Sequence, residues 1–178
     1  MLNSLRQIVQ EVNAASDLED VLDIIVRRVK STMAADVCSI FLRDENGKFV
    51  LMATEGLNAT AVGKVQLGLD EGLVGHVAAR EEPINTDDCE HHPKFQYFPE
   101  TGEERYNAFL GAPIIHQRQG LGVLVVQQVR NRRFDEGDEA FLVTMSAQLA
   151  SVIAHAEATG ALRSIGSKTE ARFMAIPG

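Results

Sequence analysis

The sequence is poor in several residue types, and each scarcity argues against a class of structure or site. Its 178 residues include no tryptophan, two tyrosines and two cysteines. Cys38 and Cys89 lie far apart and form no CxxC motif, so neither a disulfide framework nor a cysteine-rich zinc site is expected. We expect both to be free thiols, which makes a reducing cytoplasm the default compartment.

Long hydrophobic runs and positive charge are also limited. No apolar run approaches the roughly 20 residues that a bilayer span needs. The amphipathic start MLNSLRQIVQEVN is neither a secretory signal nor a transit peptide. The formal net charge of -8 argues against broad binding to nucleic acids or anionic membranes. We therefore expect one globular cytoplasmic domain, with neither nucleic acid nor membrane as a partner.

Helix patterns occur near both ends of the chain. A capping box at Ser16 and Glu19 begins a predicted helix that ends near Met33, and Asp135 is the expected N-cap of a final helix. A first helix over residues 2–13 is predicted by an apolar seam of Leu2, Leu5, Val9 and Val12. The final helix has an apolar face of Phe141, Met145, Leu149, Val152 and Ala156.

Short apolar segments between these helices predict strands. They comprise residues 37–42, 48–54, 65–67, 111–115 and 121–129, with turns at Asn46-Gly47 and Gln119-Gly120. Strands joined by tight turns form an antiparallel sheet. The predicted fold class is α/β (α+β), with a central antiparallel sheet and the terminal helices on one face. Residues 68–110 must then form a mixed helix and loop lid over the other face, where a pocket is expected.

The stretch NTDDCEHHPKF, residues 85–95, contains residue types that bind metals. Cys89, His91 and His92 could supply three zinc ligands, or Cys89 could attach a tetrapyrrole. The spacing is poor, because adjacent histidines point in different directions, and no second ligand cluster completes the set. Prolines and aromatic residues around this stretch favour a packed lid loop without a metal.

The segment GLDEGLVG, residues 68–75, has glycines but lacks the lysine and the spacing of a phosphate-binding P-loop. It instead predicts a short helix, whose first turn Asp70 and Glu71 would stabilise. The N–H groups near Gly72 could hold a carboxylate or a phosphate. Glycines selected only for close packing explain the pattern equally well.

No catalytic set can be assigned. Cys38 and Ser39 lie in a predicted strand, and His76, His116 and His155 are scattered along the chain. The sequence therefore predicts no nucleophile with an adjacent base.

These segments together resemble a GAF domain over about residues 1–160. The resemblance is carried by VCSIFLRD, LMATEGL, LDEGLVGHVA, PIN, HPKF, FLGAPI and LGVLVVQQ, followed by the long final helix. The runs DEGLVGHVAAREEPINTDD and HPKFQYFPETGEERYNAFLGAPII are similar to the N-terminal GAF domain of nitrogen-related Enzyme I, a family of phosphoenolpyruvate–protein phosphotransferases. RFMAIPG looks like the start of that family's phosphotransfer region, so residues 161–178 are expected to be a linker into it.

The resemblance implies a sensory role. The domain would sense nitrogen status through glutamine or 2-oxoglutarate and control autophosphorylation of the attached enzyme. Phosphoenolpyruvate, Mg²⁺ and the downstream phosphocarrier protein would belong to later domains, so neither catalysis nor a cofactor is expected in this chain. The Asn-Lys-Phe-Asp-Glu signature of cyclic-nucleotide-binding GAF domains is not found in the sequence, which disfavours cAMP and cGMP.

The pocket is expected between the sheet and the lid. Asn85, Thr86 and Asp87 should lie nearest the ligand, with Cys89, His91 and His92 pointing outward or capping. The predicted ligand-binding residues are Cys38, Ile40, Leu67, Gly72, Leu73, Val77, Thr86, Asp87 and Phe109.

Two alternative functions remain open. We expect a homodimer, and the domain could be a dimerisation scaffold that pairs through the seam of the first helix beside the final helix, although that seam could simply cover its own core. Some GAF domains reduce free methionine sulfoxide, a reaction that needs a nucleophilic thiolate and a resolving partner. Only Cys38 and Cys89 are available for that chemistry.

Overall fold

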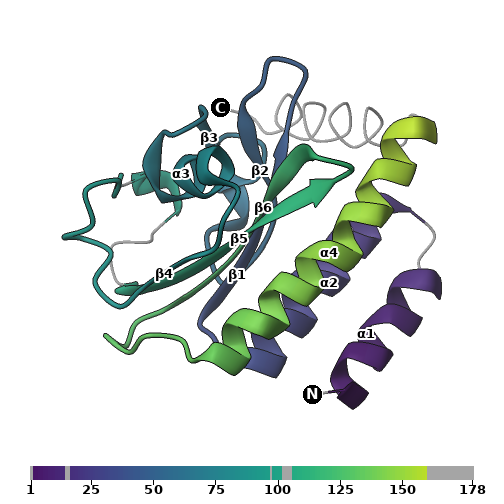
Figure 1. The fold of residues 1–178 in the computed structure, drawn as a ribbon, viewed down its shortest axis with the longest axis horizontal. Coiled ribbons are helices and arrows are strands. Elements are labelled where there is room, and N and C mark those ends of the chain that lie inside the picture. The colour runs from purple at the N-terminus through teal and green to yellow at the C-terminus, as the bar shows by residue number, and fades with distance from the viewer. Residues whose placement is uncertain (1, 15–16, 97, 102–105, 160–178) are drawn as a thin grey trace.

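The computed structural model describes residues 2–14, 17–96, 98–101 and 106–159. A six-stranded antiparallel sheet lies between two unequal covers (Figure 1). Three helices cover one face: α1 (Leu2–Ala14), α2 (Leu18–Met33) and α4 (Glu136–Thr159). The short helix α3 (Gly72–Arg80) and irregular segments cover the other. This arrangement confirms the predicted fold class.

The strands pair in the order β3-β2-β1-β6-β5-β4, and every neighbouring pair is antiparallel. The two central strands, β1 and β6, are buried along almost their whole length. The strands are β1 (Val37–Arg43), β2 (Phe49–Glu55), β3 (Gln66–Leu67), β4 (Ile84–Thr86), β5 (Ala108–His116) and β6 (Gln119–Gln128). Two short 3₁₀ helices, η1 (Ala59–Ala61) and η2 (Pro99–Thr101), complete the described elements.

The turn between β5 and β6 differs from the prediction. It consists of Gln117 and Arg118, with φ angles of 49° and 66°, whereas Gln119 and Gly120 are already the first residues of β6. Two consecutive positive φ angles are typical of a type I′ turn, which normally uses asparagine and glycine. Gln-Arg carries no such signal, so the sequence pointed to the nearest glycine instead.

The N-cap of α2 also differs from the prediction. Asp17 is the N-cap, and its Oδ1 accepts a hydrogen bond of 2.9 Å from the backbone N–H of Asp20. Ser16, the predicted cap, lies outside the described residues, as do the predicted linker residues 161–178. The predicted cap of α4 is present, because Asp135 Oδ1 accepts from the N–H of Asp138 at 2.8 Å.

Helix α1 packs on its own domain. Ile8 is 1% exposed and belongs to the core under the helices, with Leu5 and Val12 packed against that core. The buried face is therefore centred on Ile8, whereas the predicted seam contained Val9 and not Ile8. This packing supports the alternative in which the seam covers its own core.

The sheet separates two hydrophobic cores. The helix-face core contains the buried side chains of α2 and α4 together with Cys38, Ile40 and Leu42 of β1. The lid-face core contains Phe41 of the same strand, because successive side chains of a strand point to opposite faces. Cys38 and Ile40 do share a face, as predicted, but it is the face covered by the helices.

Residues 136–156 of α4 are long and apolar enough to cross a membrane by length and composition alone. The core helix of a globular domain passes the same test. Here Leu142, Met145 and Leu149 are at most 1% exposed in the helix-face core. Packing against the sheet therefore accounts for the apolar character of this side of α4.

Candidate functional site

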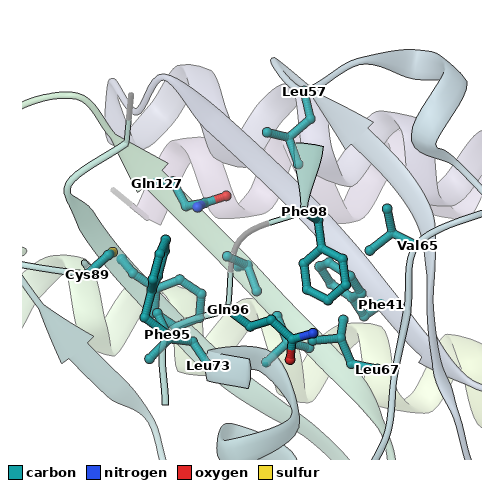
Figure 2. A pocket seen from close by; sticks show the side chains of 13 residues that line it. Phe41, Leu57, Val65, Leu67, Leu73, Cys89, Phe95, Gln96, Phe98 and Gln127 are labelled. Atoms are coloured by element: carbon teal, nitrogen blue, oxygen red, sulfur yellow. The ribbon is translucent and has the colours of Figure 1, made fainter. Parts of the chain in front are cut away.

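A small cavity lies within the lid-face core, between the sheet and its cover (Figure 2). Its walls come from strands, from α3 and from the loop that follows β4. The cavity volume is about 40 Å³. The lining residues are Phe41, Leu57, Val65, Leu67, Leu73, Val74, Cys89, Phe95, Gln96, Phe98, Phe109, Val125 and Gln127.

The cavity is too small for a metabolite in this conformation. A volume of about 40 Å³ has room for only a few water molecules, because one water needs about 10–15 Å³ on this measure. Pockets that hold small molecules are usually on the order of 300–1,000 Å³. A ligand of amino-acid size could therefore enter only if one wall moved.

Among the residues that the structure describes, none that lines the cavity has a charged side chain. Its polar groups are the amides of Gln96 and Gln127 and the thiol of Cys89. Gln127 extends from the central strand β6 and is only 6% exposed, and its side-chain amide contains both a donor and an acceptor. An unpaired charge would be costly here, and the cavity suits an uncharged group that bonds to amides.

The lid segment, residues 88–96, forms one wall and has only turns and bends. The N–H of Cys89 donates to the carbonyl of Asn107 at 2.8 Å, and the N–H of Phe95 donates to the carbonyl of His92 at 2.9 Å. Cys89 is 1% exposed and lines the cavity. The prediction that Cys89 points outward or caps is therefore wrong, because this backbone path turns its side chain into the lid-face core.

The two histidines of the lid segment differ in environment. The exposed His91 ring hydrogen-bonds with the carboxylate of Asp88 at 2.8 Å, which raises the pKa of His91. The Nδ1 of the half-buried His92 accepts from the N–H of Lys94 at 3.1 Å. Partial burial, followed by the proximity of His76, lowers the pKa of His92.

Asp70 joins the lid segment to the loop before α3. Its Oδ1 accepts from Nδ1 of His76 at 2.6 Å, and its Oδ2 accepts from Nζ of Lys94 at 2.9 Å. The hydrogen bond from His76, and then that from Lys94, lowers the pKa of the Asp70 carboxyl. Asp70 has a φ of 64°, in the left-handed region that few residues adopt.

The structure brings together only part of the predicted ligand-binding set. Leu67, Leu73 and Phe109 line the cavity. Gly72 lies beside it: a Cβ there would be 2.7 Å from Cδ2 of Leu67, and its φ is 65°. Val77 is buried in the same core without lining the cavity.

The remaining predicted residues lie elsewhere. Cys38 and Ile40 are in the helix-face core, and Asp87 is exposed. Thr86 does not line the cavity, and its Oγ1 accepts from the N–H of Asp88 at 3.3 Å. The amide of Asn85, also expected near the ligand, donates to the carbonyl of Phe134 at 2.8 Å, toward the start of α4.

Sequence reasoning missed most of the aromatic and amide lining. Phe41 could have been found from strand alternation had the face of β1 been known. No sequence signal distinguishes Gln127 from the neighbouring Gln128. Phe95 and Phe98 were recognised as anchors of the lid but were not assigned to the cavity.

The start of α3 is poorly suited to the anion that the sequence suggested it could hold. The carboxylate of Glu71, its N-cap residue, accepts from the N–H of Gly68 at 2.7 Å. Asp70 adds a second carboxylate beside that terminus. Two negative charges disfavour a third.

The arrangement also limits metal and thiol chemistry. Among the residues that the structure describes, no three His, Cys, Asp or Glu side chains are grouped to hold a metal ion. The two cysteines lie in different cores, on opposite faces of the sheet. They cannot act as attacking and resolving thiols for one substrate without unfolding, and burial also raises the pKa of Cys38.

A larger hollow of about 210 Å³ lies at the hairpin ends of the sheet, near the end of α3. Its lining includes Arg43, Phe49, Leu69 and Ile115. Leu69 is 65% exposed there. None of the predicted ligand-binding residues lines this hollow, so the cavity between the sheet and the lid segment is the candidate site.

Comparisons with known proteins agree with the fold and extend it to a family. The GAF domain family model matches residues 17–153. The phosphoenolpyruvate-dependent phosphotransferase system protein of Salmonella typhimurium is 43% identical over 178 residues, or 99% of this chain. The chain spans only 23% of that relative's length.

Solved structures are similar over most of the chain. The GAF domain from a phosphoenolpyruvate-protein phosphotransferase of Coxiella burnetii has a TM-score of 0.86 and 52% identity, covering 90% of this chain and 96% of that one. A free methionine-R-sulfoxide reductase from Neisseria meningitidis, in complex with its substrate, has a TM-score of 0.72 at 19% identity, covering 83% of this chain and 84% of that one. That likeness shows the fold alone. The chain therefore belongs to the GAF domain family and is a GAF domain of the kind that phosphoenolpyruvate–protein phosphotransferases carry.

Proposed function

We propose that this GAF domain senses a small molecule in the lid-face cavity and thereby controls autophosphorylation of an attached phosphoenolpyruvate–protein phosphotransferase. The observation that carries the proposal is a cavity with a buried amide in its floor and a loop as one wall. A loop wall can change position when a ligand binds, whereas strands packed in a sheet are rigid.

The ligand would report nitrogen status, and the cavity favours glutamine over 2-oxoglutarate. The side-chain amide of glutamine can exchange hydrogen bonds with the amide of Gln127. The two carboxylates of 2-oxoglutarate would find no cation among the described residues of the lining, and burial without a partner is costly for a charge. The charged end of glutamine would have to remain outside the cavity, in contact with water.

Calorimetric titration of the domain with each metabolite tests this proposal. We expect glutamine to bind and to raise the melting temperature, and 2-oxoglutarate to bind more weakly. Replacing Gln127 with Leu should weaken glutamine binding about tenfold, the value of one or two hydrogen bonds. Gln128→Leu is the matched control, because the Gln128 amide instead donates to the carbonyl of Arg132. If neither metabolite releases or absorbs heat on titration and neither shifts the melting temperature, both ligands are refuted.

The catalytic parts of the proposed system lie outside this chain. Phosphoenolpyruvate, Mg²⁺ and the phosphocarrier protein would be handled by other domains of a longer cytoplasmic protein. The GAF domain would itself be non-enzymatic, and the placement of its two thiols in separate cores supports this. Incubation with methionine sulfoxide and a thiol reductant should therefore yield no methionine.

Dimerisation through α4 is a second candidate function. Residues 140–156 contain no Asp, Glu, Lys or Arg, although several of their side chains face solvent. Val143 among them is 42% exposed. A long surface without charged side chains is typical of the centre of a protein–protein interface. The other exposed residues of this face are Ala140, Thr144, Ala147, Gln148, Ser151 and His155.

Light scattering at micromolar concentration tests the dimer. We expect a dimer for the natural sequence and a monomer for Val143→Arg. Val129→Arg is the matched control, because Val129 is 47% exposed but follows β6, away from α4. A monomeric natural sequence would refute this second function and leave the first intact.

A further inference from the structure

In the present conformation the cavity is too small for the ligand that the proposed function requires. The cavity measures about 40 Å³, so one wall must open. Phe41, Phe109 and Gln127 belong to strands paired within the sheet. The lid segment, residues 88–96, contains neither helix nor strand, and segments of this kind open at the lowest free-energy cost.

Besides the packing of Cys89 and Phe95 in the lid-face core and the hydrogen bond from the N–H of Cys89 to the carbonyl of Asn107, few polar contacts among the described residues fasten the lid segment. Of the ion pairs among described residues, only Lys94–Asp70 joins this segment to another part of the fold. The His91–Asp88 pair lies within the segment itself. The hydrogen bond from the Gln96 amide to the carboxylate of Glu71 is long, at 3.5 Å.

Asp70 is built to hold a fixed position. Its N–H donates to the carbonyl of Gly75 at 2.8 Å, so its backbone is tied to the first turn of α3. Its carboxylate is held by His76, a residue of α3, through the 2.6 Å hydrogen bond. One oxygen is thereby oriented by the helix, and the other is presented to Lys94 on the lid segment.

We propose that residues 88–96 are the moving wall of the cavity and that Asp70 is the latch that holds this wall closed through Lys94. His76 is a positioning residue that aims the Asp70 carboxylate. The proposal deepens the proposed function, because it names how entry to the cavity is regulated. It requires no particular ligand.

A weak latch fits this task. The side chains of Lys94 and Asp70 are 36% and 50% exposed, and pairs of this kind change an equilibrium by about fivefold at most. The binding free energy of a ligand in the opened cavity can offset the small cost of breaking the Lys94–Asp70 ion pair. A buried ion pair in the same place would hold the wall shut.

The two cysteines supply an internal measurement. Cys89 lies on the lid segment and becomes accessible when the wall opens. Cys38 lies on β1, in the helix-face core, and becomes accessible only when the domain unfolds. Labelling with N-ethylmaleimide, followed by mass spectrometry of the two cysteine peptides, reports the population of the opened wall and that of the unfolded domain in one experiment on the full chain.

The test variant is Asp70→Asn. Asparagine has the same shape and tolerates positive φ, so the backbone is preserved while the charge is lost. We expect Cys89 to be labelled about two- to fivefold faster, with Cys38 unchanged. Lys94→Met should produce the same increase, and the double variant should add nothing further, because both changes remove one interaction.

Asp88→Asn is the matched control. It removes a carboxylate from the lid segment itself, but one whose partner among the described ion pairs is His91 of the same segment, so both thiols should keep their natural rates. An unchanged Cys89 rate in Asp70→Asn would overturn the proposal, as would a parallel rise at both thiols. If Cys89 is labelled faster in Asp70→Asn but calorimetry detects no glutamine binding, the latch is supported and only the identity of the ligand is refuted.

Discussion

Gly122 and Gly120 lie two residues apart on β6 but have opposite steric surroundings. A Cβ at Gly122 would be 2.1 Å from the carbonyl oxygen of Phe41 on β1, whereas a Cβ at Gly120 would meet no atom within 4 Å. The close approach is to backbone, which cannot rotate away. Glycine at Gly122 is therefore a requirement of the β1–β6 pairing.

We expect Gly122→Ala to lower the free energy of unfolding by about 1–3 kcal/mol, as overpacking does. Gly120→Ala should change it by less than about 0.5 kcal/mol. Urea denaturation of the two variants measures both values. Equal stabilities would show that the β1–β6 spacing is wrong.

His92 makes closure of the lid segment sensitive to pH. Its pKa is lowered in the closed state by burial and by His76, so this state binds fewer protons than an open one. Closure is then favoured above the ordinary histidine value of about 6.5 and weakens as pH falls below it. Asp70, Lys94 and His76 face the same corner.

We expect protection of Cys89 from N-ethylmaleimide to fall between pH 7.5 and pH 5.5. Each rate is divided by the rate of the denatured chain at the same pH, which removes the titration of the thiol. His92→Asn should abolish the dependence. His91→Asn should keep it, because His91 is exposed and pairs within the lid segment. Protection that rises on acidification would contradict the assignment.

At the scale of elements, the start of α2 depends on one side chain. Asp17 Oδ1 satisfies the N–H of Asp20, one of the four donors that a helix leaves unpaired at its start. The helix then contributes Leu22, Ile25 and Val26 to the helix-face core. A defect at this cap therefore affects global stability.

Asp17→Ala should lower the free energy of unfolding by about 1 kcal/mol, measured by urea denaturation. Asp17→Ser should retain most of the stability, because a serine hydroxyl can accept the same hydrogen bond. Equal losses in both variants would show that the charge near the helix dipole, and not the cap, is what matters.

At the scale of the whole molecule, the two cores differ in how much they contribute to global stability. The helix-face core includes the buried sides of α2 and α4, whereas the lid-face core is closed partly by loops. Global stability should therefore reside mainly on the helix face. The lid face can then rearrange without loss of the fold.

Leu124→Ala should lower the free energy of unfolding by about 2–5 kcal/mol, because Leu124 is fully buried in the helix-face core. Phe95→Ala, on the partly buried lid side, should cost less and should selectively accelerate labelling of Cys89. Thermal unfolding together with thiol labelling separates the two effects. Acceleration of Cys38 by Phe95→Ala would show that the cores are not separable.

Much of the architecture could be predicted because local patterns agree with tertiary structure. The 3.6-residue periodicity of α2 and α4 and the Asn-Gly turn after β1 need no distant partners. The three-residue β4 and the Gln117–Arg118 turn could not be predicted, because neither is long enough or typical enough to leave a signal. β4 exists through its pairing with β5.

The sequence by itself determined the helices, the antiparallel pairing and the likeness to the GAF family. Only the tertiary structure decided which face of β1 meets the cavity. Cys38, Ile40 and Leu42 are as buried as Phe41, because this central strand is covered on both sides. Alternation therefore shows which residues of β1 share a face, but it does not show which face meets the cavity. The burial of Cys89 was decided the same way, by a loop path that distant contacts with Asn107 and Asp70 impose.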